Sequence, residues 1–152
     1  MNLTYIRNSA QYRNAWVDFL KTKEFHYFCT LTFIDRNTSR AQAEAMLKTW
    51  WRKTNRKLYG GASATVQLQF FAVLEGTEIY NPHWHLLVRQ PTRSLRRPTS
   101  NDVCRTIEHT WQSLNKAGFC NEAEPIREHD AACGYIAKEI GGPDSPFYTW
   151  GL

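Results

Sequence analysis

The sequence lacks the features that mark membrane proteins, disulfide-rich proteins and zinc modules. It has no apolar run near the length of about 20 residues that a membrane span requires. Residues 1–7 contain no apolar core of a secretory signal. The four cysteines are scattered and form no Cys-x-x-Cys pair: Cys29, Cys104, Cys120 and Cys133. We therefore expect free thiols in an intracellular protein with no membrane partner.

Acidic residues are outnumbered, and internal repeats and low-complexity tracts are absent. Asp and Glu total 14 against 19 Lys and Arg, which gives a formal net charge of +5. This balance favours a polyanionic partner, although it also suits a mildly basic soluble protein. A length of 152 residues with 42% hydrophobic residues predicts one domain spanning 1–152. Its tail, 143–152, is either flexible or packs back through Phe147, Tyr148 and Trp150.

Hydrophobic periodicity predicts an alternation of helices and strands. Helical spacing marks residues 10–21, 40–59, 100–116 and 129–140. Aromatic and β-branched residues mark strands at 25–33, 66–75, 83–89 and 119–128. Thr38 or Ser39 is expected to cap the second helix, and Ser100 or Asn101 the third. The order predicts an α+β fold with a ferredoxin-like antiparallel sheet, in which a β-α-β-β-α-β core packs two helices on one face and extra helices precede and follow it.

Two histidines separated by one residue are the strongest chemical signal in the sequence. In a strand, His83 and His85 leave the same face while Trp84 packs on the other. Glu75 ends the preceding strand and comes alongside them if the two strands pair, with Glu78 in the turn as the alternative. Two imidazoles and one carboxylate suit a divalent metal with open positions. The competing interpretation is two ordinary half-buried histidines opposite a solvent-facing carboxylate.

The last predicted helix carries a second group of polar side chains. Tyr135, Lys138 and Glu139 lie at positions i, i+3 and i+4, so they project from one face of the helix. A phenol is a poor nucleophile at neutral pH unless a cation or metal stabilises the phenolate. For an isolated helix, a packed tyrosine beside two solvated charges would be the simpler interpretation.

These segments together resemble the HUH endonuclease superfamily, and in particular the single-tyrosine rolling-circle replication initiators (Rep proteins) of plasmids and single-stranded DNA viruses. Segment 28–33, Phe-Cys-Thr-Leu-Thr-Phe, resembles the first family motif. The segment His83-Trp84-His85 with Glu75 before it resembles the metal motif, and residues 135–138, Tyr-Ile-Ala-Lys, resemble the Y-x-x-K motif. Their order along the chain matches the order in the family.

The resemblance implies a DNA endonuclease and strand transferase that cuts and rejoins single-stranded DNA at an origin. Tyr135 would form a 5′-phosphotyrosine link, and Lys138 would offset charge on the phosphate or phenolate. The metal held by His83, His85 and Glu75 would be Mg²⁺ or Mn²⁺, with Glu139 as a further ligand. The expected partners are an origin in stem-loop form and a helicase or host replication proteins. The expected compartment is the cytoplasm of a prokaryotic host, or the nucleus for a eukaryotic virus.

Candidate DNA contacts follow from the resemblance and from charge. Basic side chains cluster in a helix and in a loop: Arg52, Lys53, Arg56 and Lys57, and Arg93, Arg96 and Arg97. Both clusters can also be ordinary solvated surfaces. Tyr27, Thr30 and Thr32, in or beside the first motif, are further expected contacts.

Three other functions remain open from the residues. A transposase or a relaxase would use the same chemistry on transposon or transfer-origin DNA. A non-catalytic module would bind single strands without forming an adduct, and a hydrolase would cut with water and leave no protein on the DNA.

Overall fold

A five-stranded antiparallel sheet forms the centre of the protein in the computed structural model, which describes residues 9–92, 98–138, 140 and 147–152. The strand order is β4-β1-β3-β2-β5. The strands are β1 (Tyr27–Thr32), β2 (Phe70–Glu75), β3 (His83–Val88), β4 (Glu122–Pro125) and β5 (Phe147–Trp150). The first four follow the predicted ferredoxin-like arrangement, which confirms the α+β fold class.

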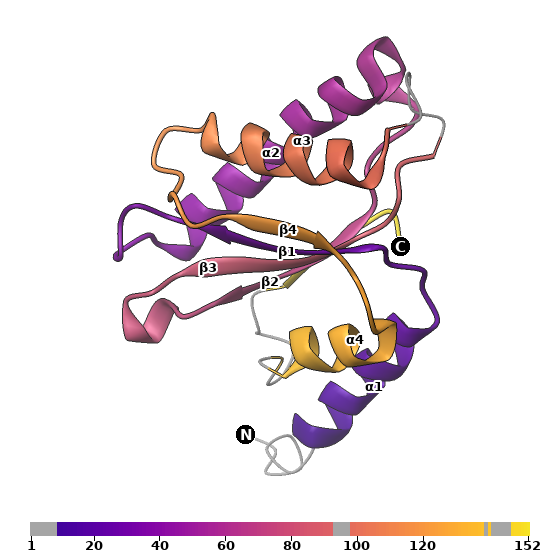
Figure 1. The fold of residues 1–152 in the computed structure, drawn as a ribbon. Helices are drawn as coiled ribbons and strands as arrows, with labels where there is room; N and C mark the ends of the chain where they lie inside the picture. The colour runs from indigo at the N-terminus through magenta and orange to yellow at the C-terminus, as the bar shows by residue number, and fades with distance from the viewer. Residues whose placement is uncertain (1–8, 93–97, 139, 141–146) are drawn as a thin grey trace.

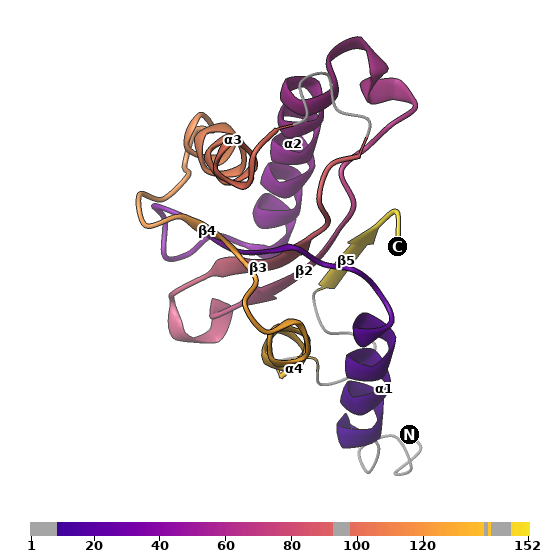
Figure 2. The same cartoon turned by 45° about the vertical axis from the view of Figure 1, so that its right-hand side comes forward.

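Helices cover both faces of the sheet (Figures 1 and 2). They are α1 (Ser9–Lys21), α2 (Arg40–Tyr59), α3 (Ser100–Gln112) and α4 (His129–Ala137). Helices α2 and α3 lie on one face, as the predicted core requires, and α1 and α4 lie on the other. Each face therefore has its own apolar core.

Alternation along β3 shows how the two faces divide the side chains. Trp84 and Leu86 are fully buried in the core beneath α2 and α3. Leu87 packs in the core beneath α1 and α4, and His83 and His85 share its face because side chains two apart in a strand point the same way. The sequence pattern predicts this separation of Trp84 from the histidines, and the structure confirms it.

Several element ends differ from the predicted ones. The predicted strand from residue 66 begins only at Phe70, because the short 3-10 helix Gly60–Ala64 precedes it and Leu68 N donates to Asn55 Oδ1 instead of a strand. Helix α3 is capped by Thr99 in a capping box with Asp102, so the prediction of Ser100 or Asn101 is wrong. Ser39 caps α2, as predicted.

The last two predicted elements are also shorter than expected. Strand β4 covers residues 122–125 in place of 119–128, and α4 ends at Ala137 in place of residue 140. The main-chain N–H of Gly118 bonds to Thr32 O at 2.8 Å, which holds the segment before β4 outside the regular ladder.

The end of the chain forms a strand that the periodicity did not resolve. Strand β5 pairs with β2, and the Phe147 ring packs 4.6 Å from Trp16, centroid to centroid. This excludes the flexible alternative for residues 147–150, while 143–146 lie outside the described residues. All four cysteines are free thiols, as expected. In the part of the chain that the structure describes, no helix combines the length and apolarity of a membrane span.

Candidate metal and nucleophile site

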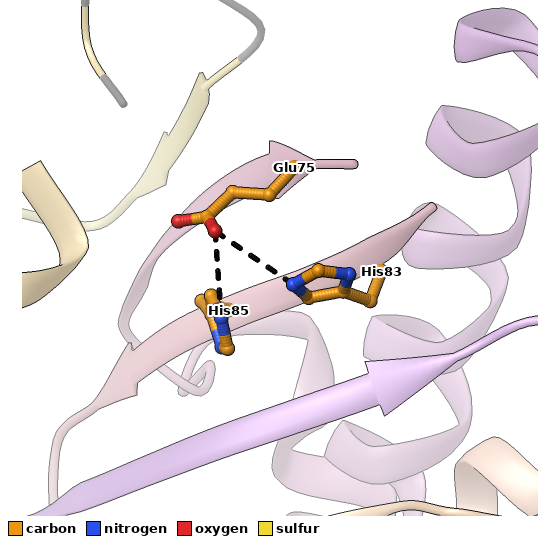
Figure 3. A group of neighbouring side chains, drawn as sticks. All are labelled: Glu75, His83 and His85. Carbon is orange, nitrogen blue, oxygen red and sulfur yellow. Dashed lines mark ion pairs between the residues drawn. The ribbon is translucent and has the colours of Figure 1, made fainter. Parts of the chain in front are cut away.

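The hairpin of β2 and β3 positions three possible metal ligands. Glu75 is the register partner of His83, and His85 lies two residues further along β3 on the same face. The turn between the strands needs Gly76, whose φ is +75° and where a Cβ would lie 2.1 Å from Asn81 O. The sequence thus folds locally so that the carboxylate and both imidazoles converge, as Figure 3 shows.

The distances between these side chains suit one shared cation. Glu75 Oε2 lies 3.7 Å from His83 Nε2 and 3.6 Å from His85 Nε2. One donor atom from each of the three residues falls within 4.8 Å of the others. Two imidazole nitrogens and a carboxylate oxygen are donors that divalent metals accept. Glu78, the alternative carboxylate, is exposed in the turn and is not a member of this group.

Neighbouring groups hold the two imidazoles in orientation. His83 Nδ1 lies 2.8 Å from Asn81 O and donates to it when the proton is on Nδ1. His85 Nδ1 lies 3.1 Å from Thr30 Oγ1, its register partner on β1. With Nδ1 engaged in both rings, the two Nε2 lone pairs are left toward Glu75, which is the usual second-shell arrangement of a histidine metal site.

Burial and charge give the two histidines opposite pKa shifts. The hydrogen bond with Glu75 raises the pKa of His83. Burial lowers the pKa of His85 to about 4, so that ring is neutral at pH 7, the form that binds metal. Glu75 Oε1 is buried and has no hydrogen-bond partner among the described residues. A buried carboxylate oxygen without a partner is costly, so the donor set and its charge fit a bound cation.

Helix α4 places Tyr135 and Lys138 beside this group. The Tyr135 ring is 47% exposed, and its centroid lies 5.5 Å from that of His85. Lys138 Nζ lies 3.8 Å from the centroid of the Tyr135 ring and 3.9 Å from Glu75 Oε2. The ammonium group therefore contacts both the phenol ring and the carboxylate of the ligand group. Residue 139, the predicted further ligand Glu139, lies outside the described residues.

The expected DNA contacts separate into different places. Thr30 uses its hydroxyl to bond His85, so we reassign it to orienting that ring. Tyr27 is 1% exposed and its hydroxyl bonds Gln90 and Ser100, because its strand position faces α2 and α3; we withdraw it as a DNA contact. Thr32 pairs with His83 on the metal face and stays a predicted contact.

The two basic clusters do not join the metal site. Four predicted contacts lie on α2, across the sheet from the ligand group: Arg52, Lys53, Arg56 and Lys57. The basic loop with Arg93, Arg96 and Arg97 lies outside the described residues.

Comparison with known families identifies the chain. A family model for replication-associated proteins of the ORF2 type matches residues 26–142, more than half of the 152 residues. The chain belongs to this replication-associated protein family. With the Glu75, His83 and His85 group, this membership confirms the resemblance to Rep proteins of the HUH superfamily. Comparisons with curated proteins and with solved structures gave no match.

Membership in the replication-associated family links the chain to DNA replication, and the matched range contains the whole ligand group. Three neighbours of that group were not predicted as site residues. The Phe28 ring lies 5.2 Å from His85 and 5.7 Å from Tyr135, Asn81 accepts from His83, and Asn121 Oδ1 accepts from Thr32 N at 2.8 Å. Strand alternation from Thr30 could have revealed Phe28, whereas the two asparagines depend on loop conformations.

Proposed function

We propose that this Rep-family domain nicks and rejoins single-stranded DNA at a replication origin, with Tyr135 as the nucleophile. The observation that carries the proposal is the convergence of Tyr135, Lys138 and Glu75 from two different elements. A half-exposed phenol ring lies 5.5 Å from a buried, neutral imidazole and directly under an ammonium group. A tyrosine that merely packs against the sheet would not need a cation that also contacts a buried carboxylate.

The proposed reaction is a transesterification. The Tyr135 phenol loses its proton, its oxygen attacks the phosphorus, and the bond from phosphorus to the 3′ oxygen breaks. The 3′ oxygen takes up a proton, and the 5′ phosphate remains on the tyrosine. Because one phosphodiester replaces another, a 3′ hydroxyl can attack the link later and rejoin the strand without ATP.

The residues of the chain would divide the work. Glu75, His83 and His85 would hold Mg²⁺ or Mn²⁺, which supplies Lewis-acid polarisation of the scissile phosphate. Lys138 lies 3.8 Å from the Tyr135 ring centroid, so it favours the phenolate by its charge. Phe28 packs edge-on against Tyr135 and at a tilt against His85, which limits the positions that the phenol ring can take.

The proposed setting follows from the family. The substrate would be an origin presented as a single strand in a stem-loop, and a helicase or host replication proteins would extend the nicked strand. The compartment would then be the one that houses the replicating DNA: the prokaryotic cytoplasm, or the nucleus for a eukaryotic virus.

The deciding experiment is formation of a covalent adduct. The protein is incubated with a panel of labelled origin oligonucleotides and Mn²⁺, and a denaturing gel is examined for a shifted band. Wild type should form the adduct, and Tyr135→Phe should lose it while binding the oligonucleotide about equally. Tyr80→Phe is the matched control, because Tyr80 is 65% exposed in the turn next to the ligand group and should keep the adduct.

Each other outcome points elsewhere. An adduct that persists in Tyr135→Phe would contradict the assignment of the nucleophile. Cutting without an attached protein indicates a hydrolase, and binding without cutting indicates a non-catalytic module. Adducts formed only with transposon ends or transfer origins indicate a transposase or a relaxase.

A further inference from the structure

We propose that helix α2 carries a second site for single-stranded nucleic acid, on the face of the sheet opposite the metal ligands. The site would consist of a basic groove on one side of α2 and an aromatic groove on the other. It extends and rests on the proposed function, because the strand held here would be a part of the substrate away from the cut. Its existence does not require cleavage, so it can be tested separately.

The basic groove lies between α2 and α3 and encloses about 610 Å³. Five of its lining residues carry or can carry a positive charge: Arg52, Lys53, Arg56, Lys57 and His109. The residues that line this groove include no Asp or Glu. Lys53 Nζ reaches across it to Ser113 Oγ at 3.1 Å. A row of cations without interleaved carboxylates attracts a chain of phosphates, and its affinity would fall with salt.

The floor of the basic groove is held in place by packing between the two helices. Thr54 and Thr110 are buried and bond each other through their hydroxyls at 2.7 Å. Trp50 Nε1 donates to Ile107 O at 3.1 Å. These contacts fix α2 against α3, so the cations above them project from a rigid base.

The aromatic groove lies between α2 and β5 and encloses about 500 Å³. The rings of Trp51 and Trp150 lie 4.1 Å apart, centroid to centroid, and Trp150 is 42% exposed. Trp51 Nε1 donates to Leu68 O at 3.1 Å, and Trp150 Nε1 donates to Gln67 Oε1 at 3.0 Å. Both indoles are therefore held in place before any ligand arrives, with an exposed π-face on which a base can stack.

Charge at the aromatic groove also favours a polyanion. Lys48 and Arg52 line it, and Arg52 lines the basic groove as well. Glu44, the acidic residue of this lining, bonds Arg40 at 2.9 Å and also bonds Tyr148. Its charge is therefore largely compensated within the protein.

The combination of the two grooves identifies the partner. A polynucleotide repeats a phosphate and a planar ring along its length, so it matches cations and exposed indoles that lie on either side of one helix. An acidic peptide would satisfy the basic groove but would leave the indoles without stacking partners. Duplex DNA keeps its bases stacked inside, so a single strand is the better match.

The test uses Tyr135→Phe protein with EDTA and a fluorescein-labelled oligothymidine, so that neither metal nor nucleophile contributes. The double variant Arg52→Gln/Arg56→Gln should bind about tenfold more weakly. It should also lower the slope of log K against log salt by about 1.4, because each lost single-strand phosphate contact removes about 0.7. Trp150→Leu should weaken binding about tenfold and remove most of the tryptophan quenching by the oligonucleotide.

Two matched controls keep the result specific. Arg105→Gln removes an exposed cation of α3 that lines neither groove, and Phe19→Leu removes a ring of similar exposure, 38%, on α1. Both should bind like the parent protein, and all variants should keep its circular dichroism spectrum. Trp150→Phe keeps a ring and should recover most of the affinity.

The proposal would be overturned by unchanged affinity in both groove variants, or by equal losses in the controls. Competition by polyglutamate as strong as by oligothymidine would also overturn it in favour of an acidic protein partner. Failure of the adduct assay with intact oligothymidine binding would contradict only the proposed function. The reverse pattern, adduct formation without any groove dependence, would contradict only this site.

Discussion

Among single side chains, Thr30 links β1 to the ligand group. Its Oγ1 lies 3.1 Å from His85 Nδ1, so it can accept the proton that leaves Nε2 available for a metal. The side chain of His85 is only 8% exposed, which means that few water molecules can replace this bond. The hydroxyl thus has a specific task in orienting a ligand.

We expect Thr30→Val to weaken Mn²⁺ binding by about 10- to 100-fold, as loss of a second-shell partner usually does. Isothermal titration calorimetry of the metal-free protein measures the change. Thr30→Ser keeps the hydroxyl and should bind Mn²⁺ nearly as tightly as wild type. Equal affinities for the valine and wild-type proteins would show that Thr30 does not orient His85.

Between elements, the segment that joins α3 to β4 is tied closely to β1. Gly118 N donates to Thr32 O at 2.8 Å, and Trp111 Nε1 donates to the same oxygen at 2.8 Å. A Cβ at Gly118 would lie 2.2 Å from Thr32 Oγ1 and 2.9 Å from the Thr32 backbone carbon. Since Thr32 pairs with His83, this contact connects the loop to the metal face.

Gly118→Ala should therefore lower the free energy of unfolding by about 1–3 kcal/mol, because the added methyl group must displace strand backbone. Gly61→Ala is the matched control: no atom lies within 4 Å of its Cβ, and the change should stay within about 0.5 kcal/mol. Urea unfolding followed by circular dichroism measures both. Similar values for the two variants would contradict the close approach.

Across the protein as a whole, the sheet separates two chemical faces. The ligand group and Tyr135 lie on the side of α1 and α4, while the cations of α2 lie on the other side. A metal that binds the folded chain and not the unfolded one stabilises the entire domain, because the ligands come from two strands that unfolding separates.

We expect Mn²⁺ at 100 times its Kd to add about 2.7 kcal/mol of stability, which raises Tm by about 5 to 10 °C in a protein of this size. EDTA should reverse the shift. His83→Ala should abolish it, and His109→Ala, which removes an exposed histidine across the sheet, should retain it. Differential scanning calorimetry with and without metal measures these shifts. A shift of the same size in His83→Ala would place the metal elsewhere.

Much of the fold and of the site followed from local patterns in the chain. Strand alternation separated Trp84 from His83 and His85, and helical spacing defined α2 with its Ser39 cap. The three motifs in order indicated the Rep resemblance, which the family match confirmed. These features depend on residues close together in sequence, so their periodicity and spacing are readable without a structure.

Only tertiary structure decided the choice of Glu75 over Glu78 and the position of β5 beside β2. It also moved Thr30 from a DNA contact to a partner of His85, and put the α2 cations on the face away from Tyr135. Each of these depends on which segments far apart in sequence become neighbours. Such neighbours are set by strand pairing and by packing on both faces of the sheet, and no single segment encodes them.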